Sequence, residues 1–547
     1  MKKIIKRTSL FLLEFLTVLL ILSTLLFFIK VGISRFHVII SFVITCIIEF
    51  FYHKKDTKKE FAKYILISLG IIVVSTLVST YMFDRSSDGN TYHKDAIGVM
   101  KEGFNPVYEE SLDFIVKRDG NDDYGAYSIW TDHYAKANWI TESSFYALTG
   151  NIESAKAVNF ISAYIAFGVI FTVLSSIKLG TVKTTLLAGL TVLNPVTGAQ
   201  LFTFYNDQLV FYYLVISVIM LIKLDKNIKH NTSWYIYIMS FIILANMKFN
   251  GMGYLMVFSF LFVCKYLYKA IKDKKFIDVF KRLCIIFIPL FIVSFLIVGY
   301  PTYVKNTLDH GNPVFPLYDP NGEDIITLQQ PEDFVKKIPA EKLFIGTFSK
   351  VTNLREDRNK TELKIPFTVF KEEIVPACSF DLRISGWGIF FSGLLIVSLI
   401  VLVAMYKKYK KESYILYTLG ITTILLLAMS ESWWARYTPH FYFFVLLALY
   451  ILFRYNKNKI VNGFITALIL VNTLLPLGGN LYFTLKNSIA INNKLNSLRG
   501  QEIVIKNNGA YGALYNLKDY GIKFTSDDNL EGEELYYKYL TYEKKAN

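Results

Sequence analysis

The chain has 547 residues, of which 53% are hydrophobic and only 19% are charged, and its formal net charge is +15. A soluble protein of this length carries more charge and lacks long apolar runs, so the composition excludes a soluble globular enzyme. The four cysteines are too few for a disulfide framework.

Apolar runs recur along the whole chain, and a helix of about 20 such residues crosses a bilayer. The sequence therefore predicts an all-α polytopic membrane protein with about thirteen transmembrane helices. The first run is long for a signal peptide and no small-residue cleavage site follows it, so we interpret it as a retained span. The predicted spans cover residues 8–29, 36–52, 64–83, 157–177, 184–203, 206–224, 234–249, 251–269, 280–300, 386–406, 413–429, 438–454 and 460–480.

Lysine and arginine clusters predict the orientation, because short cytoplasmic loops carry an excess of these residues. With a cytoplasmic N-terminus, the clusters at 54–59, 223–229, 265–282 and 407–411 all fall on the inner side. This predicts a multi-pass protein of the cell membrane whose C-terminal tail is extracytoplasmic. Because the basic excess is mostly a topology signal, membrane lipid is the predicted partner and nucleic acid is not.

This topology divides the chain into five predicted parts. The tail alternates short β-like runs, such as Glu502 to Lys506 and Ile522 to Thr525, with helical ones, which predicts a small α/β domain. The parts are N-terminal extra helices at 1–63, a transmembrane core at 64–300 with a first large outer loop at 84–156, a second outer loop at 301–385, C-terminal helices at 386–480, and the tail at 481–547.

The first outer loop opens with two carboxylates, Asp84 and Asp88, directly after a predicted span. Gly89 and Asn90 permit a sharp turn that can aim Asp88 inward, so Asp88 is our first candidate for a general base and Asp84 the second. In the plainer interpretation Asp84 caps a helix and Asp88-Gly89 is an ordinary turn. We expect no cofactor; a divalent metal held by His93 and nearby carboxylates is the alternative, although their spacing matches no specific metal signature.

Several features occur in a characteristic order on the predicted outer side. They are the acidic first loop, Tyr205-Asn206-Asp207, Lys248-Phe249-Asn250-Gly251, Asn306 followed by Gly311-Asn312-Pro313, and Arg436-Tyr437. In these features the chain resembles the GT-C glycosyltransferases, and most closely the bacterial lipid-linked sugar transferases related to protein mannosyltransferases and aminoarabinose transferases. The resemblance covers roughly residues 64–480, and two additional spans precede the one that usually comes first in that family.

The resemblance implies an inverting transferase that moves a sugar from a polyprenyl phosphate to an acceptor outside the cytoplasm. The acceptor would be a cell-wall polymer, a lipid glycan or a protein. Asp88 would accept the proton of the acceptor, and cations would stabilise the departing phosphate. The implied substrate-binding residues are Lys248, Arg436, Asp207, Tyr437, His93 and Lys305.

Each of these residues also has a structural interpretation. Lys248 can snorkel to the membrane interface, Arg436 can pair with Glu431, and Asp207 can cap the next helix, which is the favoured role for that residue. At the level of function, the alternatives are a polysaccharide polymerase or ligase, which also joins lipid-linked sugars, and a lipid or solute transporter.

Overall fold

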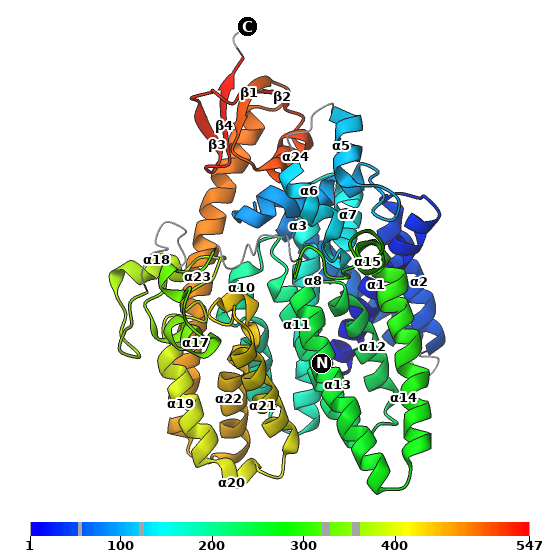
Figure 1. Ribbon diagram of the computed structural model, residues 1–547, viewed down its shortest axis with the longest axis vertical. Helices are drawn as coiled ribbons and strands as arrows, with labels where there is room; N and C mark the ends of the chain where they lie inside the picture. The colour runs from blue at the N-terminus through cyan, green and yellow to red at the C-terminus, as the bar shows by residue number, and fades with distance from the viewer. Residues whose placement is uncertain (1, 53–56, 120–124, 320–328, 353–360, 546–547) are drawn as a thin grey trace.

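Long helices run side by side through most of the molecule, and short helices and one small sheet gather at one end of them (Figure 1). The structure is a computed structural model that describes residues 2–52, 57–119, 125–319, 329–352 and 361–545.

Seven of the described helical segments are long and apolar enough to cross a membrane. This finding supports a helical membrane protein, as the composition predicts. The segments are α1 (Lys2–Phe28), α3 (Lys58–Thr80), η2 with α8 (Ile152–Ser176), α11 (Asp207–Lys226), α13 (Phe249–Lys272), α14 with η3 (Phe276–Val298) and α23 (Lys459–Ser497).

The six remaining predicted spans coincide with or contain shorter apolar helices of 10–17 residues. Every predicted span is therefore an apolar helix or contains one, but only seven have the length that a full crossing requires. The shorter segments are α2 (Phe36–Tyr52), α9 (Thr181–Val192), α12 (Asn231–Ala245), α19 (Phe391–Ala404), α21 (Ser413–Ala428), and η9 with α22 (Pro439–Tyr455).

One predicted span, 184–203, is two helices instead of one. α9 ends at Val192, and α10 (Pro195–Gln200) begins after Asn194. The Asn194 side chain accepts hydrogen bonds from the N–H groups of Val196 and Thr197, and Pro195 occupies the first helical position. An N-capping asparagine followed by proline starts a new helix, because proline cannot donate into the preceding one.

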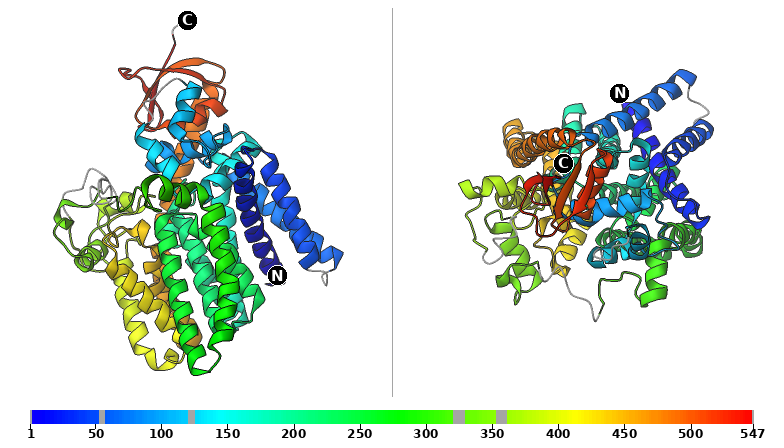
Figure 2. Two further views of the ribbon diagram at one scale, coloured as in Figure 1. Left: turned by 45° about the vertical axis from the view of Figure 1, so that its right-hand side comes forward. Right: turned by 90° about the horizontal axis from the view of Figure 1, so that it is seen from above.

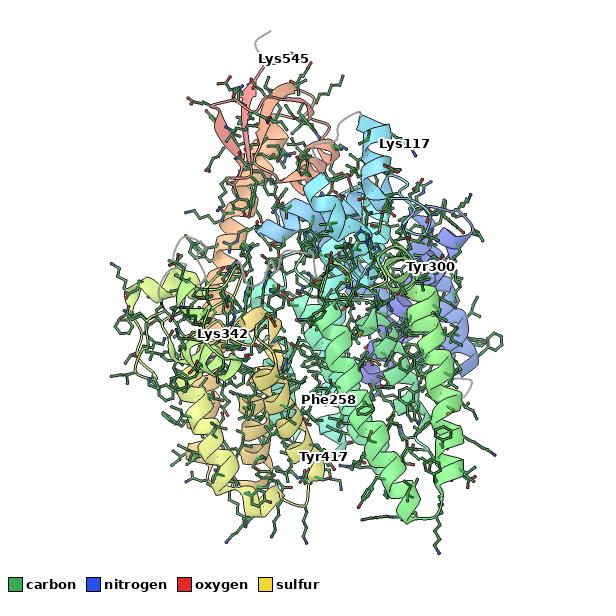
Figure 3. The ribbon with its side chains drawn as sticks, viewed as in Figure 1. Lys117, Phe258, Tyr300, Lys342, Tyr417 and Lys545 are labelled. Carbon is green, nitrogen blue, oxygen red and sulfur yellow. The ribbon has the colours of Figure 1, made fainter. Side chains whose placement is uncertain are left out.

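The long helices form two groups, which Figure 2 shows from two further directions. In one group α1 packs against α2 and α8, and α11 packs against α12 and α13; in the other α19 packs against α22. Phe258 of α13 and Tyr417 of α21 line a pocket between the groups (Figure 3).

The three large segments that were predicted to lie outside the membrane are at the same end of the helices (Figure 1). The turn between α13 and α14 and the short helix α20 (Tyr406–Tyr409), both rich in lysine, lie at the other end. The described segments at the first end are η1 (Gly89–His93), α4 (Lys94–Lys101), α5 (Ser111–Asp119), α6 (Gly125–His133), α7 (Ala137–Thr149), η4 (Tyr300–Val304), α15 (Lys305–His310), η5 (Glu332–Phe334), α17 (Pro339–Phe348), η7 (Lys371–Glu373), α18 (Ile374–Ala377) and η8 (Ala435–Tyr437).

The C-terminal domain combines α24 (Tyr511–Asp519) with a four-stranded sheet of order β2-β1-β4-β3. The predicted small C-terminal domain with strands near 502–506 and 522–525 is confirmed, because β1 (Glu502–Asn507) and β2 (Lys523–Ser526) pair in parallel. The sequence missed the antiparallel pair β3 (Glu533–Tyr536) and β4 (Leu540–Lys544). α23 runs without interruption past residue 480 and connects the helices to this domain (Figure 1).

Candidate functional site

The loop between α3 and η1 contains Asp84 and Asp88, the two carboxylates that the sequence singles out. The two side chains differ in burial. Asp84 is completely buried, and its carboxylate accepts hydrogen bonds from the N–H of Ser86 at 2.8 Å and the N–H of Phe204 at 3.2 Å. A Cβ atom on Gly89 would lie 1.8 Å from Asp84 Oδ2, so only glycine fits there. Burial raises the pKa of Asp84. These contacts make Asp84 an organiser of the loop.

Asp88 lies immediately before η1 and remains accessible, with 27% of its side chain exposed. Its Oδ2 accepts a hydrogen bond from Arg436 Nη1 at 3.0 Å, and its Oδ1 has no hydrogen-bond partner among the described residues. The two residues are 348 positions apart in the sequence. The candidate base and the candidate phosphate ligand are therefore direct neighbours.

Arg436 lies in η8 and is buried among aromatic rings. Its guanidinium carbon is 4.6 Å from the centre of the Tyr205 ring and 4.8 Å from that of Trp434. Burial disfavours the charge, but Asp88 and other neighbours outweigh it, and the pKa of Arg436 is raised well above its ordinary value. Arg436 Nε is 3.6 Å from Asp381 Oδ1, and neither atom has a hydrogen-bond partner among the described residues.

The competing interpretation of Arg436, an ion pair with Glu431, is wrong. Within the described part of the chain, the carboxylates that contact Arg436 belong to Asp88 and Asp381. Glu431 instead accepts a hydrogen bond from the Ser430 hydroxyl. The chain turns at η8 so that Arg436 contacts Asp88, in the loop that follows α3, and not Glu431.

Lys248 lies in the turn between α12 and α13, and Asp207 is the first residue of α11. The two form a buried ion pair, and Asp207 Oδ2 also accepts a hydrogen bond from Gln200 Nε2 at 3.1 Å. Burial opposes the charge on Lys248, but the Asp207 carboxylate outweighs it and raises the pKa of the lysine. The two other interpretations are therefore wrong: Lys248 is buried and does not snorkel to solvent, and Asp207 makes no capping hydrogen bond.

Tyr437 connects the two buried cations. Its ring centre is 4.6 Å from Lys248 Nζ and 5.2 Å from the guanidinium carbon of Arg436. The negative face of an aromatic ring attracts cations, so one tyrosine helps to hold both charges close together. Arg436, Lys248 and Tyr437 thus form one cationic cluster beside Asp88.

His93 ends η1 and is buried near the same cluster. Its Nδ1 accepts a hydrogen bond from Trp139 Nε1 at 2.8 Å, so the neutral ring carries its proton on Nε2. Burial, and then the charge of Lys248, lower the pKa of His93 to about 3. His93 is therefore a neutral hydrogen-bond donor at ordinary pH.

Lys305 lies apart from this cluster. Its Nζ pairs with Glu110 Oε1 at 2.7 Å and donates to the Glu109 carbonyl at 3.1 Å. Within the part of the chain that the structure describes, no hydrogen bond or ion pair joins it to Asp88, Arg436 or Lys248. The structure therefore does not bring Lys305 together with the other candidates.

Sequence reasoning missed the roles of Asp381, Tyr205 and Trp139, which contact Arg436 and His93. Nothing in their spacing indicates this role, because each comes from a different segment. His440 was also missed: it is fully buried, and both its ring nitrogens lack a hydrogen-bond partner among the described residues. Its ring packs 4.5 Å from that of Tyr254, whose hydroxyl donates to the Tyr437 carbonyl.

Across the described residues, no three histidine, cysteine, aspartate or glutamate side chains gather as a set of metal ligands. No protein-family model, curated protein or solved structure matches the chain.

Proposed function

We propose that the protein is an integral membrane glycosyltransferase that moves a sugar from a polyprenyl phosphate to an acceptor outside the cytoplasm. The observation that carries the proposal is the ion pair between Asp88 and Arg436, beside Lys248 and at the end of the helices where the outer segments gather. Transfer from a lipid phosphate needs this combination of a base and phosphate-binding cations.

In the proposed reaction the acceptor oxygen attacks the anomeric carbon of the donor sugar. The bond between that carbon and the phosphate oxygen breaks, and its electron pair leaves with the polyprenyl phosphate. The acceptor proton passes to Oδ1 of Asp88, the oxygen that Arg436 does not bind. The sugar is inverted because the acceptor and the leaving group lie on opposite faces.

Arg436 supports the departing phosphate. A guanidinium presents its N–H groups in a planar fork that matches two phosphate oxygens. In the structure Nη1 donates to Asp88 and the buried Nε faces Asp381 Oδ1 at 3.6 Å, so Nη2, which has no hydrogen bond with a described residue, remains to bind the substrate. Lys248 is the second cation, and the growing charge on the leaving phosphate strengthens both contacts in the transition state.

The remaining members of the cluster would position the substrate. Asp207 holds the Lys248 ammonium in place, Tyr437 contacts both cations, and His93 offers its Nε2 proton to a sugar or phosphate oxygen. No cofactor enters this scheme. Asp84 would act through the loop conformation that it stabilises, which places Asp88.

The test compares envelope glycans in a strain without the protein and in the same strain expressing variants. Wild type and Asp113→Asn, which alters an exposed carboxylate on α5, should restore the same glycan modification, as detected by mass spectrometry. Asp88→Asn should reduce it by about 100-fold, because a general base contributes roughly 10²–10⁴ to rate. Equal abundance of the three proteins in the membrane shows that they fold.

Full restoration by Asp88→Asn would remove the proposed base. A transporter would give a different result, because the lipid-linked sugar would change sides in vesicles containing the purified protein without any new glycosidic bond. Accumulation of unused polyprenyl-phosphate sugar in the Asp88→Asn strain supports transfer as the missing step.

A further inference from the structure

A pocket with polar and apolar lining residues lies where α1, α8 and α11 meet the start of α12. Lys223 follows Asp207 on α11 by sixteen residues, which places it about 24 Å along the helix from the candidate active site. The polar residues that line the pocket include Lys6, Thr172, Lys223, His230, Thr232 and Ser233.

Two lysines, Lys6 and Lys223, line this pocket. Among the described residues, neither Lys6 Nζ nor Lys223 Nζ has a hydrogen bond or an ion pair with a carboxylate. Lys265, at the same end of the helices, is paired with Asp225 at 2.7 Å. Two like charges at one pocket repel each other, so an anion bound between them would be stabilised by both.

The other polar groups are hydrogen-bond donors or can act as donors. The N–H of Ser233 donates to His230 Nδ1 at 3.1 Å, so the neutral histidine carries its proton on Nε2. Burial, and then the charges of Lys223 and Lys6, lower the pKa of His230, which keeps it neutral. The Thr172 hydroxyl is buried and has no hydrogen-bond partner among the residues that the structure describes.

The helix that borders the pocket adds to this preference. α12 has 15 residues and begins at Asn231, beside the lining residues Thr232 and Ser233. The N-terminus of a helix carries a partial positive charge and attracts anions. A phosphate group has several oxygens that accept hydrogen bonds. The pocket offers them two ammonium groups, a histidine N–H, hydroxyls and a helix N-terminus.

We propose that this pocket binds a phosphate group, carried either by an anionic phospholipid or by a free phosphate compound. The apolar lining residues Leu13 and Ile236 continue the pocket into the helices, as an acyl chain attached to the phosphate would require. The positive-inside pattern places this end at the cytoplasmic leaflet, where anionic lipids and phosphate compounds are both present. The pocket does not depend on the proposed sugar transfer.

The test measures binding to the purified full-length chain in a neutral detergent. The probes are dihexanoyl phosphatidylglycerol, dihexanoyl phosphatidylcholine and inorganic phosphate, each titrated against the shift in thermal unfolding midpoint. The variants are Lys6→Gln/Lys223→Gln and the control Lys229→Gln, which removes an equivalent exposed charge from the same loop as His230 without touching the pocket. Unfolding midpoints without probe establish that each variant is folded.

Phosphatidylglycerol should bind wild type and Lys229→Gln equally and the double variant about 30-fold more weakly, since each basic residue near an anionic headgroup contributes roughly fivefold. Competition by inorganic phosphate supports the pocket and assigns it to free phosphate compounds, whereas binding without competition supports it and assigns it to the lipid. Equal binding by wild type and the double variant, or an equal loss in Lys229→Gln, overturns the proposal. So does equal affinity for phosphatidylcholine.

Discussion

Replacing Lys94 with methionine is expected to loosen the C-terminal domain from the segment that contains the candidate active site. Lys94 is completely buried in α4, and its Nζ donates to Glu153 Oε1 at 2.5 Å and to Asn516 Oδ1 and the Tyr536 hydroxyl at 2.9 Å each. One ammonium thus connects α4, η2 and the C-terminal domain. The Tyr536 hydroxyl also donates to the Asp84 carbonyl at 3.0 Å, so the network extends to the loop of Asp88.

The expected magnitude follows from what the substitution leaves behind. Breaking a buried ion pair by removing one partner costs about 3–5 kcal/mol, because the other charge stays buried. Glu153 keeps a second cation, Lys156, so the lower end of about 3 kcal/mol applies. A change of this size raises the population of the detached state by about 100-fold.

Hydrogen exchange followed by mass spectrometry measures that population on the purified chain. Peptides from α4 and α24 in Lys94→Met should exchange about 100-fold faster than in wild type, while peptides from α11 should not change. Lys117→Met, which removes an exposed charge from α5, is the matched control. Unchanged exchange in α24 of Lys94→Met would refute the reasoning, and so would an equal effect of Lys117→Met.

Three further predictions concern the same domain and the cationic cluster. Gly98→Ala would place a Cβ atom 2.1 Å from the Tyr515 ring. It should therefore destabilise the packing of α24 on α4 by about 1–3 kcal/mol, as measured by hydrogen exchange. Gly70→Ala, whose Cβ atom would have no atom within 4 Å, should leave that exchange unchanged. Burial raises the pKa of Asp519 from 3.8 to about 6, so the folded state binds the extra proton and docking should weaken as pH rises through this window; Asp519→Asn should remove the dependence, and its persistence would contradict the assignment. Arg436→Lys keeps the charge but loses the planar fork, and should reduce glycan restoration by at least about tenfold; full restoration would show that charge alone suffices.

The helical segments could be predicted because their signal is local. Runs such as 8–29 and 460–480 are apolar over a length that suits a bilayer, and α1 and α23 cover them. β1 and β2 were also predictable from short β-like runs. β3 and β4 were not, because they are short and only four of their nine residues are hydrophobic, and they depend on pairing with each other and with β1.

The candidate site could be predicted only in part. The sequence indicated the residue types and their common end of the molecule, and it ranked Asp88 before Asp84. It could not show that Asp84 is buried and that Asp88 is accessible. It favoured a helix-capping role for Asp207 and placed Lys305 with the other substrate-binding residues. In the structure Asp207 forms an ion pair with Lys248, and Lys305 forms one with Glu110. These ion pairs depend on how distant segments pack, and the order of residues within one segment does not predict that packing.

The sequence by itself determined that the chain is apolar enough to form membrane-spanning helices, because hydrophobicity and helix length are properties of contiguous residues. Only the tertiary structure decided that Asp88 contacts Arg436 and that Tyr437 contacts both buried cations. It also decided that the C-terminal domain contacts the loop that contains Asp88, through the hydrogen bond from Tyr536 to the Asp84 carbonyl. Asp88 and Arg436 are 348 positions apart in the sequence. The energy of these contacts depends on burial, which exists only after the helices have packed.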